Sequence, residues 1–277
     1  MVHDTDGTSE LGLAANLQTA ARRYCIGRNQ FWWDVYAKQA DRKIGEDNSP
    51  EAYAAFPRYN VLNAILEDVE TITTADYHSI QELKDLLVIS GVSAQAMLTN
   101  PPPNAIASDA MDEERRMFFE FIQGITREQL RIVEPLFYRR RLREIEADPI
   151  KSAFVQRWGA NGKCCYPLTK EPAEKVRAFN VAVFEEHVGY EGLRSMLLDH
   201  GIQRLWELRE FGPCFEIEVE HMDPTYTGAE GYWSSGSFDW MIYASHEDSL
   251  TFGGWVLTSI KDEWPAWREH LFSSPWD

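Results

Sequence analysis

The front half of the chain carries apolar residues at helical spacing. From residue 11 to about residue 43 they recur every three or four positions, which predicts two consecutive helices. Two later helix starts carry capping signals, Ser79 with Glu82 and Thr126 with Gln129. The pattern therefore predicts a front half built mainly from amphipathic helices.

Prolines and arginines mark the breaks in this helical part. Ser49 with Pro50 predicts a new helix start, because proline fits the first turn of a helix. Residues 101–103 are three prolines, which predict an extended connector. Residues 138–143 hold four arginines beside two glutamates, a run typical of a solvated helix face with local ion pairs. A contact with an anion and a counterweight to acidic residues elsewhere remain open for this run, whose arginines are Arg139, Arg140, Arg141 and Arg143.

After Gly201 the apolar period shifts toward two. In residues 215–220 three apolar side chains alternate with three glutamates, which predicts a strand with one face toward a core. Residues 240–245 and 250–257 are two β-favouring runs joined by a short turn at 246–248. This arrangement predicts an antiparallel pair of strands.

The segments around these strands have other patterns. Residues 169–188 and 190–200 show helical spacing, whereas residues 228–236 are rich in turn formers. Ser259 with Asp262 resembles a capping box, and apolar residues at helical spacing follow it up to position 271. The chain is therefore expected to end in a closing helix.

The expected fold class is α+β. A mainly helical region, residues 1–150, is packed with an α+β region, residues 151–277, whose small antiparallel sheet is closed by a C-terminal helix. A length of 277 residues fits one large domain or two small ones. The sequence therefore leaves open whether the two regions share one core.

Acidic residues are concentrated in the last quarter of the chain. The formal net charge is −17, and residues 211–277 hold twelve acidic residues against Lys261 and Arg268. Such a field repels nucleic acid and anionic lipid and attracts cationic partners. Solubility alone also accounts for an acidic surface.

The remaining composition excludes several classes of protein. The four cysteines contain no CxxC pair, so neither a disulfide framework nor a zinc knuckle is expected. Residues 1–10 lack the pattern of a secretion signal, and residues 86–98 are too short and polar to cross a bilayer. These features predict a cytoplasmic protein without a membrane partner. No phosphate-binding glycine motif and no Gly-x-Ser-x-Gly motif occurs, and no cofactor is expected.

Three groups of residues invite a catalytic interpretation. His246 lies between a predicted strand and two acidic residues, and His221 lies two positions from Asp223, so acid–base work or metal binding is conceivable. Turn chemistry is the better explanation of the first group, and no metal site is expected from either. Cys164 and Cys165 are candidates for a thiol nucleophile, with His187, His200 or His221 as base, although cysteines are more often buried in a core.

The aromatic residues suggest a different use for the same region. Most should fill the core, but Tyr226, Tyr232 and Trp233 lie in a turn-rich stretch among acidic residues and are expected to be exposed. We expect a non-enzymatic module that docks a basic protein partner, by analogy with bacterial immunity-type proteins of similar charge and size. The expected contact residues are Glu216, Glu218, Glu220, Asp223, Glu230, Trp233, Asp239 and Glu247.

Two alternatives differ from this hypothesis in geometry. A hydrolase-like enzyme would use His221 and His246 with nearby carboxylates and needs a concave pocket. A scaffold subunit would use the aromatic surface as a homodimer contact, but the sequence does not give the oligomeric state.

Overall fold

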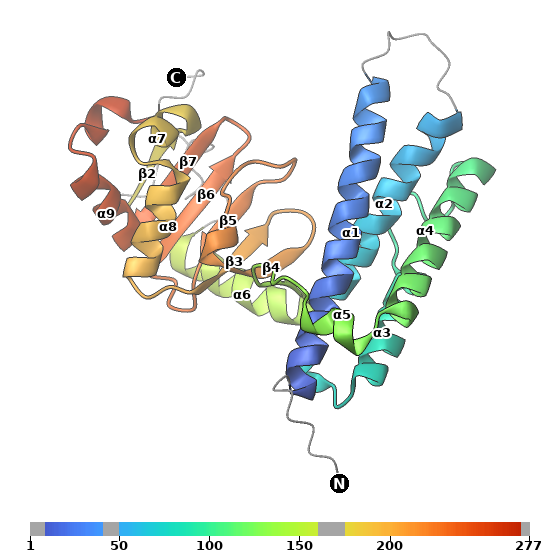
Figure 1. The fold of residues 1–277 in the computed structure, drawn as a ribbon. Coiled ribbons are helices and arrows are strands. Elements are labelled where there is room, and N and C mark those ends of the chain that lie inside the picture. The colour runs from blue at the N-terminus through green and yellow to red at the C-terminus, as the bar shows by residue number, and fades with distance from the viewer. Residues whose placement is uncertain (1–8, 41–49, 160–174, 273–277) are drawn as a thin grey trace. The chain divides into compact units, whose positions relative to one another are not determined.

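The computed structural model describes residues 9–40, 50–159 and 175–272 (Figure 1). The chain forms two compact units, Met1–Leu136 and Phe137–Asp277. Among these described residues, the first unit has one buried apolar cluster and the second has two. The expectation of an α+β fold with a helical N-terminal region is confirmed.

The first unit is built from helices. The structure has α1 (Glu10–Ala40), α2 (Pro50–Thr71), η1 (Thr74–Asp76), α3 (Ile80–Ser93), α4 (Ala105–Gly124) and α5 (Arg127–Arg131). Its core contains Leu17, Ile65, Leu87 and Phe118 from four different helices. The first of these helices is continuous, so the expectation of two helices before residue 43 is wrong: no proline interrupts residues 10–40.

Local signals set the ends of several helices as the sequence predicts. The side chain of Ser79 accepts a hydrogen bond from the backbone of Glu82 at 3.2 Å. Thr126 and Gln129 form a complete capping box at the start of α5. Pro50 is the first residue of α2, where its missing N–H leaves no helical bond unmade.

The second unit is a sheet with helices on both faces. Within the described residues, seven antiparallel strands follow the order β1-β4-β3-β5-β6-β7-β2. The strands are β1 (Arg139–Leu142), β2 (Val176–Asn180), β3 (Arg204–Arg209), β4 (Cys214–Glu218), β5 (Gly231–Ser234), β6 (Trp240–Ser245) and β7 (Ser249–Gly254). The helical segments are α6 (Glu144–Trp158), α7 (Val181–His187), α8 (Gly189–Asp199), η2 (Val219–His221), α9 (Trp255–Glu263) and η3 (Trp267–His270).

Alternation along the strands divides the core of this unit into two layers. Ile242 and Phe252 pack in one buried cluster with residues of α7, α8 and α9. Met241 and Tyr243, on the opposite face of β6, pack in another cluster with Phe154 of α6. Figure 1 shows α7, α8 and α9 on one side of the sheet and α6 on the other. Both faces of the sheet are therefore covered by helices.

Sequence periodicity predicted the central strands, but the expected strand 250–257 ends at Gly254, and residues 255–257 belong to α9. The expected antiparallel pair is β6 and β7, with Ile242 opposite Phe252. In β4 the predicted alternation is also present, since Phe215 and Ile217 are buried while Glu216 and Glu218 are partly exposed. Burial of every second side chain is the signal that sequence carries for a strand.

Three predicted elements are wrong because long-range pairing overrides a local pattern. The arginine run forms the edge strand β1 rather than a helix face, because β4 offers backbone and carboxylate partners. Residues 176–180 form strand β2, within a segment expected to be helical, and residues 231–234 of the turn-rich stretch form β5. Such pairing partners lie far away in sequence and leave no periodic signal.

The closing helix begins earlier than Ser259. It is α9, which starts directly after β7, and residues 267–270 form only a short 3-10 turn. Gly254 makes this junction, with a φ of 71° that side chains disfavour and with the backbone of Asp239 where a Cβ would lie. The glycine therefore lets the chain pass from the last strand into the helix without an intervening loop.

Candidate functional site

The strand register places the expected contact residues at two opposite ends of the sheet. Glu218, the last residue of β4, pairs with Arg204, the first residue of β3. Ser245, the last residue of β6, lies at the other end, because β4 and β6 run in opposite directions. Strands of this length span about 15–20 Å. The two ends are called the Glu218 end and the His246 end below.

The carboxylates of Glu216 and Glu218 are held by the edge strand β1 and the residue before it. Nε of Arg140 lies 3.2 Å from Oε2 of Glu216, and the Tyr138 hydroxyl donates to the same oxygen at 2.9 Å. The backbone N–H of Tyr138 donates to Glu218 Oε2 at 2.7 Å. Burial raises the pKa of Tyr138, and its hydrogen bond to Glu216 acts in the same direction. The arginine run is therefore an internal counterweight to the acidic strand.

Trp233 is not the exposed aromatic that the sequence suggested. Its side chain is 0% exposed and belongs to the cluster beneath α7, α8 and α9. Tyr232 on the other face is only partly exposed and stacks on Tyr243, with ring centres 5.0 Å apart. Tyr226 is 44% exposed, so of the three rings it alone meets the expectation fully. The alternating strand β5, where a turn was expected, explains the burial of Trp233.

Glu220 and Asp239 are exposed, but they lie toward the Glu218 end. Glu220 is in η2, which follows β4, and Asp239 is in the turn before β6. The hydroxyl of Ser237 donates to the Asp239 carboxylate. Neither residue lies at the end of the sheet that holds His246.

The His246 end brings together a chain of hydrogen-bonded groups. Glu230 is buried, accepts a hydrogen bond from the Tyr243 hydroxyl, and lies 2.7 Å from Nδ1 of His246. Nε2 of His246 lies 3.2 Å from Oε1 of Glu247. The Tyr226 ring centre is 6.1 Å from that of His246. A buried tyrosine is thus connected through two carboxylates and a histidine to the protein surface.

The backbone around this chain is fixed at several points. Asp248 in the β6–β7 turn has a φ of 53°, and its carbonyl accepts from the Val181 N–H at 2.9 Å. The N–H of Glu247 donates to the Ser245 hydroxyl at 3.2 Å. The Glu230 carbonyl accepts from the N–H of Glu210 at 2.9 Å. The backbone of this turn is therefore bound both to β6 and to the first residue of α7.

Further acidic groups lie around Tyr190 at the start of α8. Burial raises the pKa of the Tyr190 phenol, and the carboxylates of Glu185 and Asp223 act in the same direction. Both carboxylates belong to exposed residues, and Asp223 is three positions before Tyr226. We define the acidic rim as Glu185, Asp223, Tyr226, His246 and Glu247.

The two histidines of the enzyme alternative do not share a site. His221 lies at the Glu218 end, where its Nε2 is 3.4 Å from Nη1 of Arg139. His246 lies at the opposite end, with a carboxylate oxygen 2.7 Å from Nδ1 and another 3.2 Å from Nε2, and its side chain is 48% exposed.

The described residues give no geometric support for a thiol nucleophile. Cys164 and Cys165 lie outside the described ranges, whereas Cys25 and Cys214 are buried. Burial raises the pKa of the Cys25 thiol, which disfavours the thiolate needed for nucleophilic attack.

Sequence reasoning missed Glu185 and the link between Glu230 and His246. Sixteen positions separate the last two residues, and the pairing of β5 with β6 brings them together. No local motif marks such a pair, although the acidic composition of the segment was visible. Across residues 9–40, 50–159 and 175–272, no group of three or more His, Cys, Asp or Glu side chains is arranged to hold a metal ion.

Comparisons of this chain with protein-family models, with curated proteins and with solved structures find no match. In the part of the chain that the structure describes, no helix has both the length and the apolar character to cross a membrane. The function must therefore be argued from the geometry of the site itself.

Proposed function

We propose that the second unit is a non-enzymatic binding module that docks a cationic protein segment on the acidic rim. One observation carries the proposal: Tyr226 and Glu247 come from separate segments and lie beside His246, and the exposed carboxylate of Asp223 lies three positions before Tyr226 in the chain. A rim of acids with an exposed ring suits lysine or arginine side chains. Catalysis would instead require a histidine nitrogen directed at a substrate.

The chemistry of recognition follows from the same residues. The rim carboxylates attract an approaching cation and raise its association rate, and salt screens this attraction within about 10 Å at 0.1 M ionic strength. Tyr226 offers a ring face for a cation–π contact worth about 0.5–1 kcal/mol at an exposed site. Glu230 fixes His246, which in turn fixes Glu247, so part of the rim is ordered before the partner arrives.

The proposal narrows the set of contact residues. The carboxylates of Glu216 and Glu218 already bind β1 and the residue before it, and Trp233 lies in the core. These three residues therefore stabilise the sheet and are not proposed as contacts with the partner. Asp223 and Glu247 remain as direct contacts, while Glu230 acts through His246. An immunity-type role, in which the module covers the basic cleft of a toxin in a bacterial cytoplasm, is one form that this binding takes.

Titration with a 20-residue poly-L-lysine peptide tests the proposal. The double variant Asp223→Lys/Glu247→Lys should weaken binding at low salt at least tenfold, since two attractive contacts become repulsive. The matched control Asp262→Lys/Glu263→Lys makes the same change of charge at two exposed positions near the end of α9. It should change the dissociation constant less than threefold.

Equal weakening in both double variants would show that only net charge matters and would reject the rim as a site. Failure of the peptide to bind the unaltered protein at low salt would also reject it. Added salt of ~0.5 M should remove most of the binding, because the Debye length is then only a few ångströms.

A further inference from the structure

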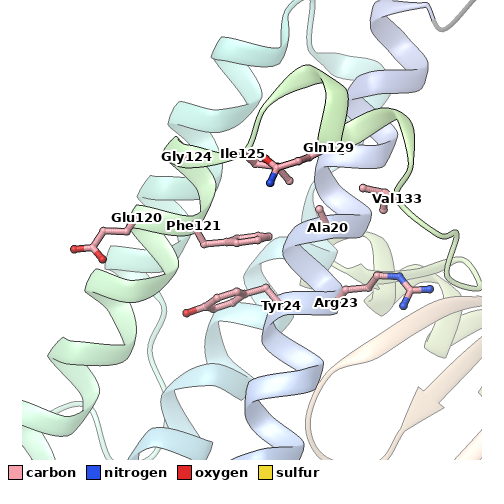
Figure 2. Close-up of a pocket in the computed structure, with 9 residues that line it drawn as sticks. All are labelled: Ala20, Arg23, Tyr24, Glu120, Phe121, Gly124, Ile125, Gln129 and Val133. Atoms are coloured by element: carbon pink, nitrogen blue, oxygen red, sulfur yellow. The ribbon is translucent and has the colours of Figure 1, made fainter.

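The helical unit contains a pocket that the acidic rim does not involve. Its volume is about 500 Å³, and it lies between α1, the end of α4 and the segment that carries α5 (Figure 2). A pocket of this size falls within the range of about 300–1,000 Å³ that small-molecule sites occupy. The lining residues are Ala20, Arg23, Tyr24, Glu120, Phe121, Gly124, Ile125, Gln129 and Val133.

Apolar side chains form most of the lining. Tyr24 and Phe121 stack with ring centres 4.6 Å apart and 24° between their planes. Tyr24, Phe121, Ile125 and Val133 are half-buried hydrophobic residues packed against the core of the bundle. Figure 2 shows the Phe121 ring directed from α4 toward Ala20 of α1. The pocket thus exposes apolar surface that the helices of the bundle do not cover.

Gly124 keeps one side of the pocket open. It is the last residue of α4, and a Cβ built at this position meets no atom within 4 Å. No positive φ requires glycine there. The missing side chain therefore leaves space in the pocket, although the backbone conformation does not require glycine.

Hydrogen bonds hold the wall that faces α4. Nε of Arg23 donates to the Glu134 carbonyl at 2.8 Å, and Nη2 donates to the Pro135 carbonyl at 3.1 Å. Nδ2 of Asn16 donates to the Leu130 carbonyl at 3.0 Å. The segment after α5 is therefore fastened to α1, and the pocket is formed before any ligand binds.

The charged groups at the pocket are already paired within the protein. Arg23 lies 3.3 Å from the Glu134 carboxylate besides its two backbone contacts, and Glu120 pairs with Arg116 at 2.7 Å. Oε1 of Gln129 accepts from the Thr126 N–H at 2.9 Å. Its Nε2 amide group has no hydrogen-bond acceptor among the residues that the structure describes, and the buried hydroxyl of Tyr24, another lining residue, has no partner there either.

We propose that this pocket binds a neutral aromatic ligand that carries one hydrogen-bond acceptor, such as a ketone or an ether oxygen. The apolar walls match a ring system, and the Gln129 amide matches the acceptor. An anionic ligand would find Arg23 already committed to the fold. This site is independent of the acidic rim and of the function proposed for it.

The probe for the test is 6-propionyl-2-(dimethylamino)naphthalene, a neutral naphthalene ketone whose emission rises in apolar surroundings. Titration of the full chain should give a saturable increase with one site per molecule. Gly124→Leu should weaken binding at least tenfold, because the new side chain enters the pocket. The variant should stay folded, since leucine favours helix over glycine and clashes with nothing near that Cβ.

Gly27→Leu is the matched control. Gly27 lies in α1, is exposed, lines no part of the pocket, and also has no atom within 4 Å of a built Cβ. This variant should bind the probe within twofold of the unaltered protein. Gln129→Glu keeps an acceptor for the Thr126 N–H but removes the amide donor, and it should weaken binding about fivefold, in line with the loss of one hydrogen bond.

Three outcomes would overturn the proposal. The first is no saturable binding to the full chain. The second is equal binding by Gly124→Leu and Gly27→Leu, with thermal unfolding showing both variants folded. The third is tighter binding of the anionic probe 8-anilinonaphthalene-1-sulfonate than of the neutral ketone, which would assign the pocket to a different class of ligand.

Discussion

The two units carry nearly the same net charge but place it differently. Residues 1–136 hold twenty-one acidic and twelve basic side chains, a net −9, and residues 137–277 hold twenty-three and fifteen, a net −8. In the helical unit, Glu114 is 0% exposed and Glu70 is paired with Arg22 in the interior. In the sheet unit, Asp223 is exposed and Glu247 is partly exposed beside His246. Net charge alone therefore does not reveal where a chain binds its partners.

The helical unit uses its acidic residues to join helices. Glu114 accepts from Arg28 at 2.6 and 2.7 Å, from Arg58 at 2.7 Å and from the Trp32 indole at 2.9 Å. These partners come from α1 and α2, whereas Glu114 belongs to α4. The hydrogen bond that Arg28 donates to Glu114 raises the pKa of Arg28. A buried carboxylate with this many donors fixes how three helices meet.

The first prediction compares a buried and an exposed aromatic residue of the sheet unit. Trp233→Ala should lower the free energy of unfolding by about 3–5 kcal/mol, because it empties a fully buried space. Tyr226→Ala, at a 44% exposed ring, should lower it by less than about 1 kcal/mol. Denaturant unfolding followed by circular dichroism measures both. A large loss for Tyr226→Ala would show that this ring is structural.

The second prediction tests the buried charge of the helical unit. Glu114→Ala should destabilise that unit by about 3 kcal/mol or more, since two guanidinium groups and an indole N–H lose their acceptor. Hydrogen exchange in residues 50–71 reports the loss locally. Asp109→Ala, at an exposed position of the same helix, is the control and should change exchange little. Equal protection in both variants would contradict a structural role for Glu114.

The third prediction concerns the basic edge of the sheet. Burial tends to raise the pKa of Glu146, but hydrogen bonds from Arg143 and Arg140 outweigh it and lower the pKa from 4.5 to about 2. A carboxyl with a lowered pKa in the folded state stabilises the protein above its ordinary pKa. This contribution is lost as the pH falls from about 5 to about 2.

Glu146→Gln removes this dependence. The difference in unfolding free energy between the unaltered protein and the variant should be roughly 1–2 kcal/mol at pH 6, allowing for solvent screening, and should vanish near pH 2. Denaturant unfolding at several pH values measures it. A difference that stays constant over this range would show that the ion pairs with Arg140 and Arg143 contribute nothing.

Local signals made part of the fold predictable. The capping residues Ser79 and Thr126 act within one turn of their helices, so sequence spacing is enough to find them. The alternation in β4 and the short turn between β6 and β7 are likewise visible over a few residues. These predictions hold because the interactions behind them span few positions.

The candidate site was predictable only in part. Sequence composition pointed to the segment that holds the candidate site and to Asp223, Tyr226 and Glu247 within it. It did not separate them from Trp233, whose burial depends on the pairing of β5 with β3 and β6. Whether the acidic rim binds a partner stays a prediction.

Amino-acid order by itself determined the helical front, the acidic tail and the strands that alternate, because each depends on neighbours in the chain. Tertiary structure alone decided that an arginine run becomes the edge strand facing Glu216, and that Glu230 reaches His246. The physical reason is that a side chain's burial and charge partners depend on strand register and helix packing. Those arrangements join residues that are distant in sequence and leave no mark on local spacing.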